Sequence, residues 1–197
     1  MAAKKAVKKS KAKKFNVKGY SDIPTGLKYP WSKPGRLWNI LWILIPILGL
    51  FAIIGYVQKI VRTIVGGDKK ELPAFGNFWD NMKAGFWAVI KLIPLIIVLN
   101  IIKWIPILGP IAWLFLALFF VPYIVVHFLV TGDFASTFDY QKVVDDVFGD
   151  IKNYVLALLK TIVYGAVYYV ASLVLVGIPC LHFGGCYFMA EFYANKN

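Results

Sequence analysis

Long uncharged stretches, separated by short polar segments, dominate this chain. Residues 37–57 and 105–130 contain 21 and 26 residues without a charged side chain, and about 20 apolar residues suffice to cross the hydrocarbon core of a bilayer. Residues 85–102 and 154–176 are similar in length, but each contains one lysine. The pattern therefore predicts four membrane-spanning helices.

The C-terminal stretch, residues 178–194, is shorter and is rich in glycine and aromatic residues. Its aromatic side chains fit the zone where a helix meets lipid headgroups. We predict that this stretch crosses the membrane as a fifth span. A re-entrant segment or a helix lying at the interface would show the same pattern.

The first apolar stretch is interrupted by Pro46, Gly49 and Gly55. If every stretch crosses, the two long linkers, residues 58–84 and 131–153, lie outside the cell. A proline break could instead turn the first stretch into a re-entrant hairpin, which would place both linkers inside. We predict a crossing and keep the hairpin as the alternative.

Two segments of the chain share one motif. The sequence Ile-Pro-Ile-Leu-Gly occurs at residues 45–49 and again at 105–109, and each copy is followed by a tyrosine and a Gly-Asp pair. Lys91 and Lys160 lie at matching places in the later apolar stretches. This repetition predicts an internally duplicated two-span unit, with a weakened third opening at Ile178-Pro179.

The composition indicates that much of the chain faces lipid rather than water. The chain is 59% hydrophobic and 17% aromatic and has a mean hydropathy of +0.66, which is more apolar surface than a 197-residue soluble core could bury. We therefore predict an all-α fold, a polytopic transmembrane helical bundle, in which residues 24–197 form the membrane domain.

Residues 1–23 form a lysine-rich arm that has too few large apolar residues to fold alone. The first 36 residues contain eleven Lys or Arg and one acid, so the positive-inside rule places the N-terminus in the cytoplasm of a multi-pass cell-membrane protein. We expect the arm to bind anionic lipid or a partner protein. Contact with nucleic acid or a ribosome is the disfavoured alternative, because the arm lacks a base-reading module. The arm lysines concerned are Lys4, Lys5, Lys8, Lys9, Lys11, Lys13 and Lys14.

Three charged residues fall within the predicted spans: Lys91, Lys160 and Glu191. A lysine near a helix end can place its ammonium among the headgroups, and this is our preferred interpretation of both lysines. The alternative is a polar pathway for an anion or a lipid headgroup, lined by these three residues.

Cys180, His182 and Cys186 have the side chains that zinc or copper prefers. Three groups without paired spacing make a weak metal candidate, and small cysteines also pack well beside glycines. We therefore predict no metal and no cofactor.

The second linker contains an amphipathic segment, residues 140–151. Its valines recur at helical spacing opposite Asp145, Asp146 and Asp150. This pattern predicts a short surface helix with a solvated acidic face, and a cation or partner site at the aspartates is the minor alternative.

Several short motifs resemble one known family. They are Gly26-Leu-Lys-Tyr-Pro30, Gly67-Asp68, Leu72-Pro73-x-Phe75, Trp79-Asp80 and Thr131-Gly132-Asp133-Phe134. Together they resemble a prokaryotic, largely archaeal family catalogued as domain of unknown function 4013, over about residues 24–194. The resemblance implies a small polytopic helical membrane protein and brings no activity or catalytic residue with it.

The sequence shows no nucleophile–base order, paired-carboxylate arrangement or phosphate-binding loop. We therefore expect a non-catalytic protein rather than an enzyme: an accessory or structural subunit of a larger membrane complex, or a membrane organiser, in contact with lipids and other membrane subunits. The alternative is a small transporter or channel for an anionic or lipid-like substrate. Transporters usually place several polar groups at mid-membrane, and these stretches contain few.

Overall fold

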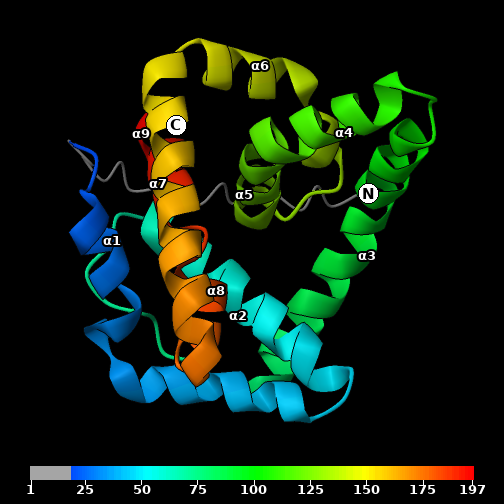
Figure 1. Cartoon of the computed structure of the whole chain (residues 1–197). Helices are drawn as coiled ribbons and strands as arrows, with labels where there is room; N and C mark the ends of the chain where they lie inside the picture. The colour runs from blue at the N-terminus through cyan, green and yellow to red at the C-terminus, as the bar shows by residue number, and fades with distance from the viewer. Residues whose placement is uncertain (1–18) are drawn as a thin grey trace, which may run out of the picture.

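The computed structural model of the chain describes residues 19–197, and every regular element in that range is a helix. The elements are α1 (Ile23–Lys28), η1 (Pro30–Ser32), η2 (Pro34–Leu44), α2 (Leu48–Val65), α3 (Phe78–Lys103), α4 (Leu108–Phe119), α5 (Val121–Thr131), η3 (Ala135–Phe138), α6 (Tyr140–Phe148), α7 (Ile151–Ala171), η4 (Ser172–Val174), α8 (Gly177–Gly184) and α9 (Tyr187–Lys196). Figure 1 shows η2 along the bottom of the molecule, α3 along its right side, α7 on the left and α6 across the top.

The two copies of the Ile-Pro-Ile-Leu-Gly motif form the same sharp turn. Ile47 has φ 64° and ψ −59°, and Ile107 has φ 66° and ψ −58°. In each copy the N–H of the following leucine donates to the proline carbonyl at 2.7 Å. These values describe a γ-turn with positive φ, which is a strained and rare conformation for a β-branched residue.

A third sharp turn joins α7 to α8. Leu175 has φ 64°, and the N–H of Val176 donates to the carbonyl of Val174 at 2.8 Å. The weakened third copy was expected at Ile178-Pro179, but these two residues lie in the first turn of α8. The turn occurs earlier because Gly177 is in close contact with the α7 backbone: an added Cβ would lie 2.2 Å from the carbonyl oxygen of Tyr168.

The prediction of one continuous helix over residues 37–57 is wrong. The chain reverses at Ile45–Ile47, so that η2 and α2 form a hairpin, which agrees with the alternative of a break at Pro46. Gly49 permits this reversal, because a Cβ there would lie 1.7 Å from the carbonyl oxygen of Trp42.

Three helices are long and apolar enough to cross a membrane: Leu48–Val65, Phe78–Lys103 and Ile151–Val174. The last two contain the predicted spans 85–102 and most of 154–176. The predicted span 105–130 is two helices, α4 and α5, bent by 50° at Phe120, and counting them as one broken span gives a fourth. Residues 19–197 therefore contain three or four candidate spans.

The predicted fifth span is also wrong as a single helix. Residues 178–194 are divided between α8 and α9 by a break at Gly185 and Cys186. The α9 segment lies in the protein interior, since Tyr187 through Phe192 are each at most 2% exposed. The apolar residues of α9 are therefore buried by other helices.

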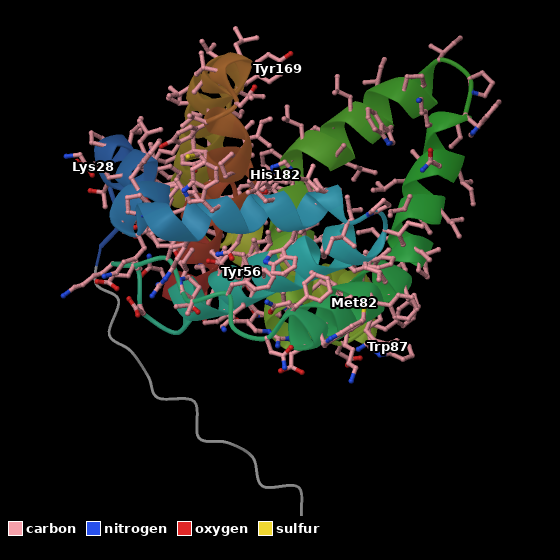
Figure 2. All side chains as sticks on the ribbon, turned by 90° about the horizontal axis from the view of Figure 1, so that it is seen from below. Lys28, Tyr56, Met82, Trp87, Tyr169 and His182 are labelled. Carbon is pink, nitrogen blue, oxygen red and sulfur yellow. The ribbon has the colours of Figure 1, made fainter. Side chains whose placement is uncertain are left out.

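The buried and the exposed apolar residues occupy different parts of the fold. Tyrosine and phenylalanine side chains from α2, α5, α7, α8 and α9 pack around one another in the core. By contrast, Trp104, Ile107 and Leu173 at two hairpin turns are 83–85% exposed. In Figure 2 the end of α7 that carries Tyr169 and the green α3–α4 hairpin both project away from the part of the molecule that contains Tyr56.

The strained turn leads to a first prediction. Ile47→Gly should stabilise the detergent-solubilised protein by about 1 kcal/mol, because glycine adopts positive φ without steric cost. Ile43→Gly, in the neighbouring η2, is the control and should destabilise by about 1 kcal/mol. Denaturant unfolding in micelles measures both changes, and equal losses for the two variants would contradict the assignment of strain to Ile47.

Candidate functional site

Glu191 is the most deeply buried charged residue of the described chain, with 1% of its surface exposed. Its carboxylate accepts hydrogen bonds from the Ser21 N–H at 2.9–3.0 Å and from the Ser21 hydroxyl at 2.8 Å. Lys69 from the first linker forms an ion pair with it at 2.6 Å. One carboxylate on α9 therefore joins the segment before α1 to the first linker.

Lys160 reaches the same segment from α7. Its ammonium donates to the Ser21 carbonyl at 2.7 Å and lies 5.8 Å from the centre of the Phe188 ring. The residues around Lys160 and Glu191 enclose no space that would hold a water molecule. Lys160 and Glu191, two residues of the predicted polar pathway, therefore both bind Ser21, and no water-sized space lies between them.

Lys91 belongs to α3, and its side chain reaches a different part of the fold, the C-terminal end of α5. Its ammonium donates to the Gly132 carbonyl at 2.5 Å, while Arg62 and Gln58 donate to the Leu129 carbonyl at 2.9 and 3.2 Å. These donors satisfy carbonyls that the helix itself leaves free, and the two cations complement the negative end of its dipole.

A cavity of about 220 Å³ adjoins these groups and is lined by Gln58, Arg62, Ala84, Trp87, Ala88, Lys91, Phe128 and Gly132. Lys160 and Glu191 are not among its lining residues. Within residues 19–197 the three ionisable residues therefore do not line one common pathway. The predicted lipid-binding lysines of the arm, Lys4 to Lys14, lie outside the described residues.

Four polar participants were not found from the sequence: Ser21, Lys69, Gln58 and Arg62. Gln58 and Arg62 did carry a signal, because a four-residue spacing places both on one face of a largely apolar helix. Ser21 and Lys69 carried none, since their partner Glu191 lies far away along the chain.

The cysteine–histidine group does not form a ligand set. Cys180 and Cys186 are free thiols, and the His182 ring bonds to the Ile178 carbonyl within its own helix at 2.9 Å. In the part of the chain that the structure describes, no three His, Cys, Asp or Glu side chains converge closely enough to hold a metal ion.

The acidic face of α6 is not fully solvated, because one of its aspartates, Asp146, is bound by other side chains. Asp146 accepts hydrogen bonds from the Tyr123 hydroxyl and, at 2.9 Å, from Lys142. Burial alone would raise the pKa of Asp146, but the bonds from Tyr123 and Lys142 outweigh it and lower the pKa. The bond from Tyr123 holds α6 against α5, whereas the bond from Lys142 lies within α6.

A second prediction follows from this lowered pKa. A carboxylate with a depressed folded-state pKa adds stability above its unfolded pKa, and this contribution disappears as the pH falls through the folded pKa. Asp146→Asn should therefore destabilise the protein at neutral pH and flatten the acid side of its stability profile. Asp145→Asn is the matched control, because Asp145 is exposed. Unfolding measured from neutral to acidic pH tests this, and parallel profiles for wild type and Asp146→Asn would contradict it.

The chain matches the family described as "Protein of unknown function (DUF4013)" over residues 39–177. No curated protein and no solved structure matches the chain.

Proposed function

Since this chain belongs to the DUF4013 family, whose members are described as proteins of unknown function, we propose a function from its own geometry: it is a non-catalytic membrane scaffold, an accessory component that organises lipids and neighbouring membrane subunits. The observation that carries the proposal is the separation between a buried aromatic core and exposed apolar hairpins.

The exposed apolar surface supports insertion into lipid. In α3, Ile93, Ile96, Ile97 and Ile101 are 44–63% exposed, and the helix has 26 residues, which gives a length of about 39 Å. Side chains of this kind gain free energy by leaving water. A soluble monomer rarely exposes so large an apolar patch.

The hydrogen bonds of Glu191 support an arrangement in which the polar segments lie on the same side of the membrane. Ser21 and Lys69 both bind this one carboxylate, and Lys142 of the second linker binds the side chain of Asn197 at the C-terminus. We propose that both linkers and both ends of the described chain lie on one membrane side, the cytoplasmic side by the charge of the arm. The hairpins would then insert from that side.

The shared turn geometry at Ile47 and Ile107 supports the proposed internal duplication. Two hairpins with the same motif, the same φ and ψ and the same hydrogen bond are what a repeated unit would produce. On this proposal the chain enters the membrane and returns to the same side three times, in the hairpin η2–α2, in α3 with the bent pair α4–α5, and in α7 with α8.

A non-catalytic role is supported by the way the buried polar groups are used. Glu191, Lys160 and Lys91 each bind groups of the protein itself. A transporter remains the competing function, and the observation in its favour is the 220 Å³ cavity beside Lys91.

Labelling of single cysteines in sealed vesicles tests the topology. In a Cys180→Ala/Cys186→Ala background, cysteines placed at Asp68, Tyr140 and Asn197 should react with a membrane-impermeant maleimide from the same side. A cysteine at Trp104 should be protected in lipid and react in denaturant. Labelling of Asp68 and Asn197 from opposite sides would overturn the one-sided arrangement.

Isolation from native membranes in mild detergent tests the role. We expect other membrane proteins to co-purify in fixed proportion, as mass spectrometry would show. A monodisperse protein without partners, combined with anion flux into proteoliposomes that Lys91→Gln abolishes, would favour the transporter instead.

A further inference from the structure

Two cavities of opposite character meet at Trp31. The first has a volume of about 600 Å³ and lies between α1, η1, the first linker and α9. The second has a volume of about 410 Å³ and lies between η2 and the turn that leads into α8. Trp31 lines both cavities, so the two are neighbours on the protein.

The first cavity is basic and rich in hydroxyl groups. It is lined by the side chains of Lys28, Lys69 and Lys70, by three Ser or Thr hydroxyls, and by aromatic rings. Lys69 is neutralised by Glu191, but neither Lys28 nor Lys70 forms an ion pair with any carboxylate of residues 19–197. Figure 2 shows Lys28 at the outer edge of the N-terminal helix. Two uncompensated ammonium groups beside hydroxyl donors suit a phosphate.

A buried tyrosine forms part of the cavity wall. Tyr29 is 3% exposed and lines the cavity, and its ring packs against the ring of Tyr187, which also lines the cavity, at 4.9 Å between centroids. These two rings give the basic cavity an aromatic wall.

The second cavity is apolar. Its lining residues include Leu37, Trp38, Leu41, Val176 and Pro179. Trp38 is 71% exposed and Leu41 is 49% exposed, so the groove is open along its side. A groove of this kind suits a hydrocarbon chain.

Trp31 is suited to the boundary between headgroup and chain. Its indole N–H donates to the Tyr168 hydroxyl at 2.9 Å, and Tyr168 in turn donates to the Leu27 carbonyl. These bonds fix a half-exposed indole ring at the junction of the polar and apolar cavities, and tryptophan is enriched at the same level of a bilayer.

We propose that these joined cavities form a binding site for one anionic membrane phospholipid, with its phosphate at Lys28 and Lys70 and an acyl or alkyl chain along Trp38, Leu41 and Val176. The inference rests on the proposed scaffold role only in placing the chain in a membrane. It names the lipid class that the scaffold would organise.

The headgroup half is tested with the full-length protein in detergent. Phosphatidylglycerol, phosphatidylcholine with the same chains, glycerol phosphate and inorganic phosphate are each titrated, and bound lipid is measured by native mass spectrometry. We expect phosphatidylglycerol to bind most tightly. Lys28→Gln/Lys70→Gln should weaken its binding about 25-fold, since each lysine near a lipid surface contributes about fivefold.

The matched control is Lys83→Gln/Lys152→Gln, which removes the same charge at exposed positions outside both cavities. Equal weakening by the two pairs would overturn the site in favour of diffuse attraction by the net positive charge of the protein. Equal binding of phosphatidylcholine would overturn headgroup recognition, and equal binding of glycerol phosphate would overturn the role of the chain.

The apolar half is tested with Leu41→Asn. This variant should weaken phosphatidylglycerol binding and leave inorganic phosphate binding unchanged, whereas Leu114→Asn, at a similarly exposed position of α4, should do neither. Unchanged thermal unfolding of both variants shows that the fold is intact. If Leu41→Asn binds the lipid like wild type, the groove does not hold the chain, while the one-sided topology remains separately testable by cysteine labelling.

Discussion

Gly85→Ala is expected to destabilise the protein by about 3 kcal/mol, at the upper end of the cost of overpacking. Gly85 of α3 faces α2 so closely that an added Cβ would lie 1.9 Å from the Phe51 carbonyl oxygen. The contact is reciprocal, because a Cβ on Gly55 would lie 1.9 Å from the Asn81 carbonyl oxygen. Backbone cannot yield as a flexible side chain can, so one methyl group must push the two helices apart.

The chain offers a matched control in Gly165. This glycine also lies within a long helix, α7, but an added Cβ there would meet nothing within 4 Å. Gly165→Ala should stabilise by about 0.5–1 kcal/mol, through the lower backbone entropy of alanine in the unfolded chain. The two substitutions have the same chemistry and should change stability in opposite directions.

A double variant sharpens the test. Once the helices have separated to accommodate one methyl group, the second costs less, so Gly55→Ala/Gly85→Ala should cost less than the sum of the single variants. Denaturant unfolding in micelles gives all four values. If Gly85→Ala is as stable as Gly165→Ala, the close crossing of α2 and α3 does not stabilise the fold.

The all-helical character, the membrane-type apolarity and the family were correctly predicted from the sequence, because each depends on composition or local motifs. The hairpin at Pro46 was only the alternative prediction. A 21-residue apolar stretch can form one helix or two short ones, and the outcome depends on how closely Gly49 approaches Trp42. That distance is a tertiary property. It does not appear in hydrophobic periodicity.

The prediction of a fifth span in the C-terminal segment was wrong for a related reason. Residues 178–194 are rich in apolar and aromatic side chains, but those of α9 are buried by α2, α5 and α7 rather than by lipid. Hydropathy does not distinguish these two surroundings. The candidate site shows the same limit, since Glu191 was identified as unusual but its partners Ser21 and Lys69 come from distant segments.

Glu191→Ala should destabilise the protein by about 3–5 kcal/mol, which is the usual cost of removing one partner of a buried ion pair. The substitution leaves the Lys69 ammonium, whose side chain is 17% exposed, without its carboxylate. It also removes the acceptor of the Ser21 N–H and hydroxyl. The loss is large because three donors lose the one acceptor that they share.

The double-mutant cycle with Lys69 separates the ion pair from the hydrogen bonds. Lys69→Ala alone should cost less than Glu191→Ala, because Ser21 still donates to the carboxylate. The double variant should cost less than the sum, and the difference is the coupling energy of the pair. Glu71→Ala is the surface control: its pair with Lys33 at 3.3 Å joins side chains that are 44% and 54% exposed, so its loss should stay within about 1 kcal/mol.

The same variants also bear on topology. If the Glu191 carboxylate holds Ser21 and Lys69 on one side of the membrane, its removal should release the first linker as well as lower the stability. A cysteine at Asp68 should then react with maleimide faster in Glu191→Ala than in Glu71→Ala. Equal unfolding free energies and equal labelling rates in these two variants would show that α9 does not join the polar segments. The one-sided arrangement of the hairpins would then lose its main structural support.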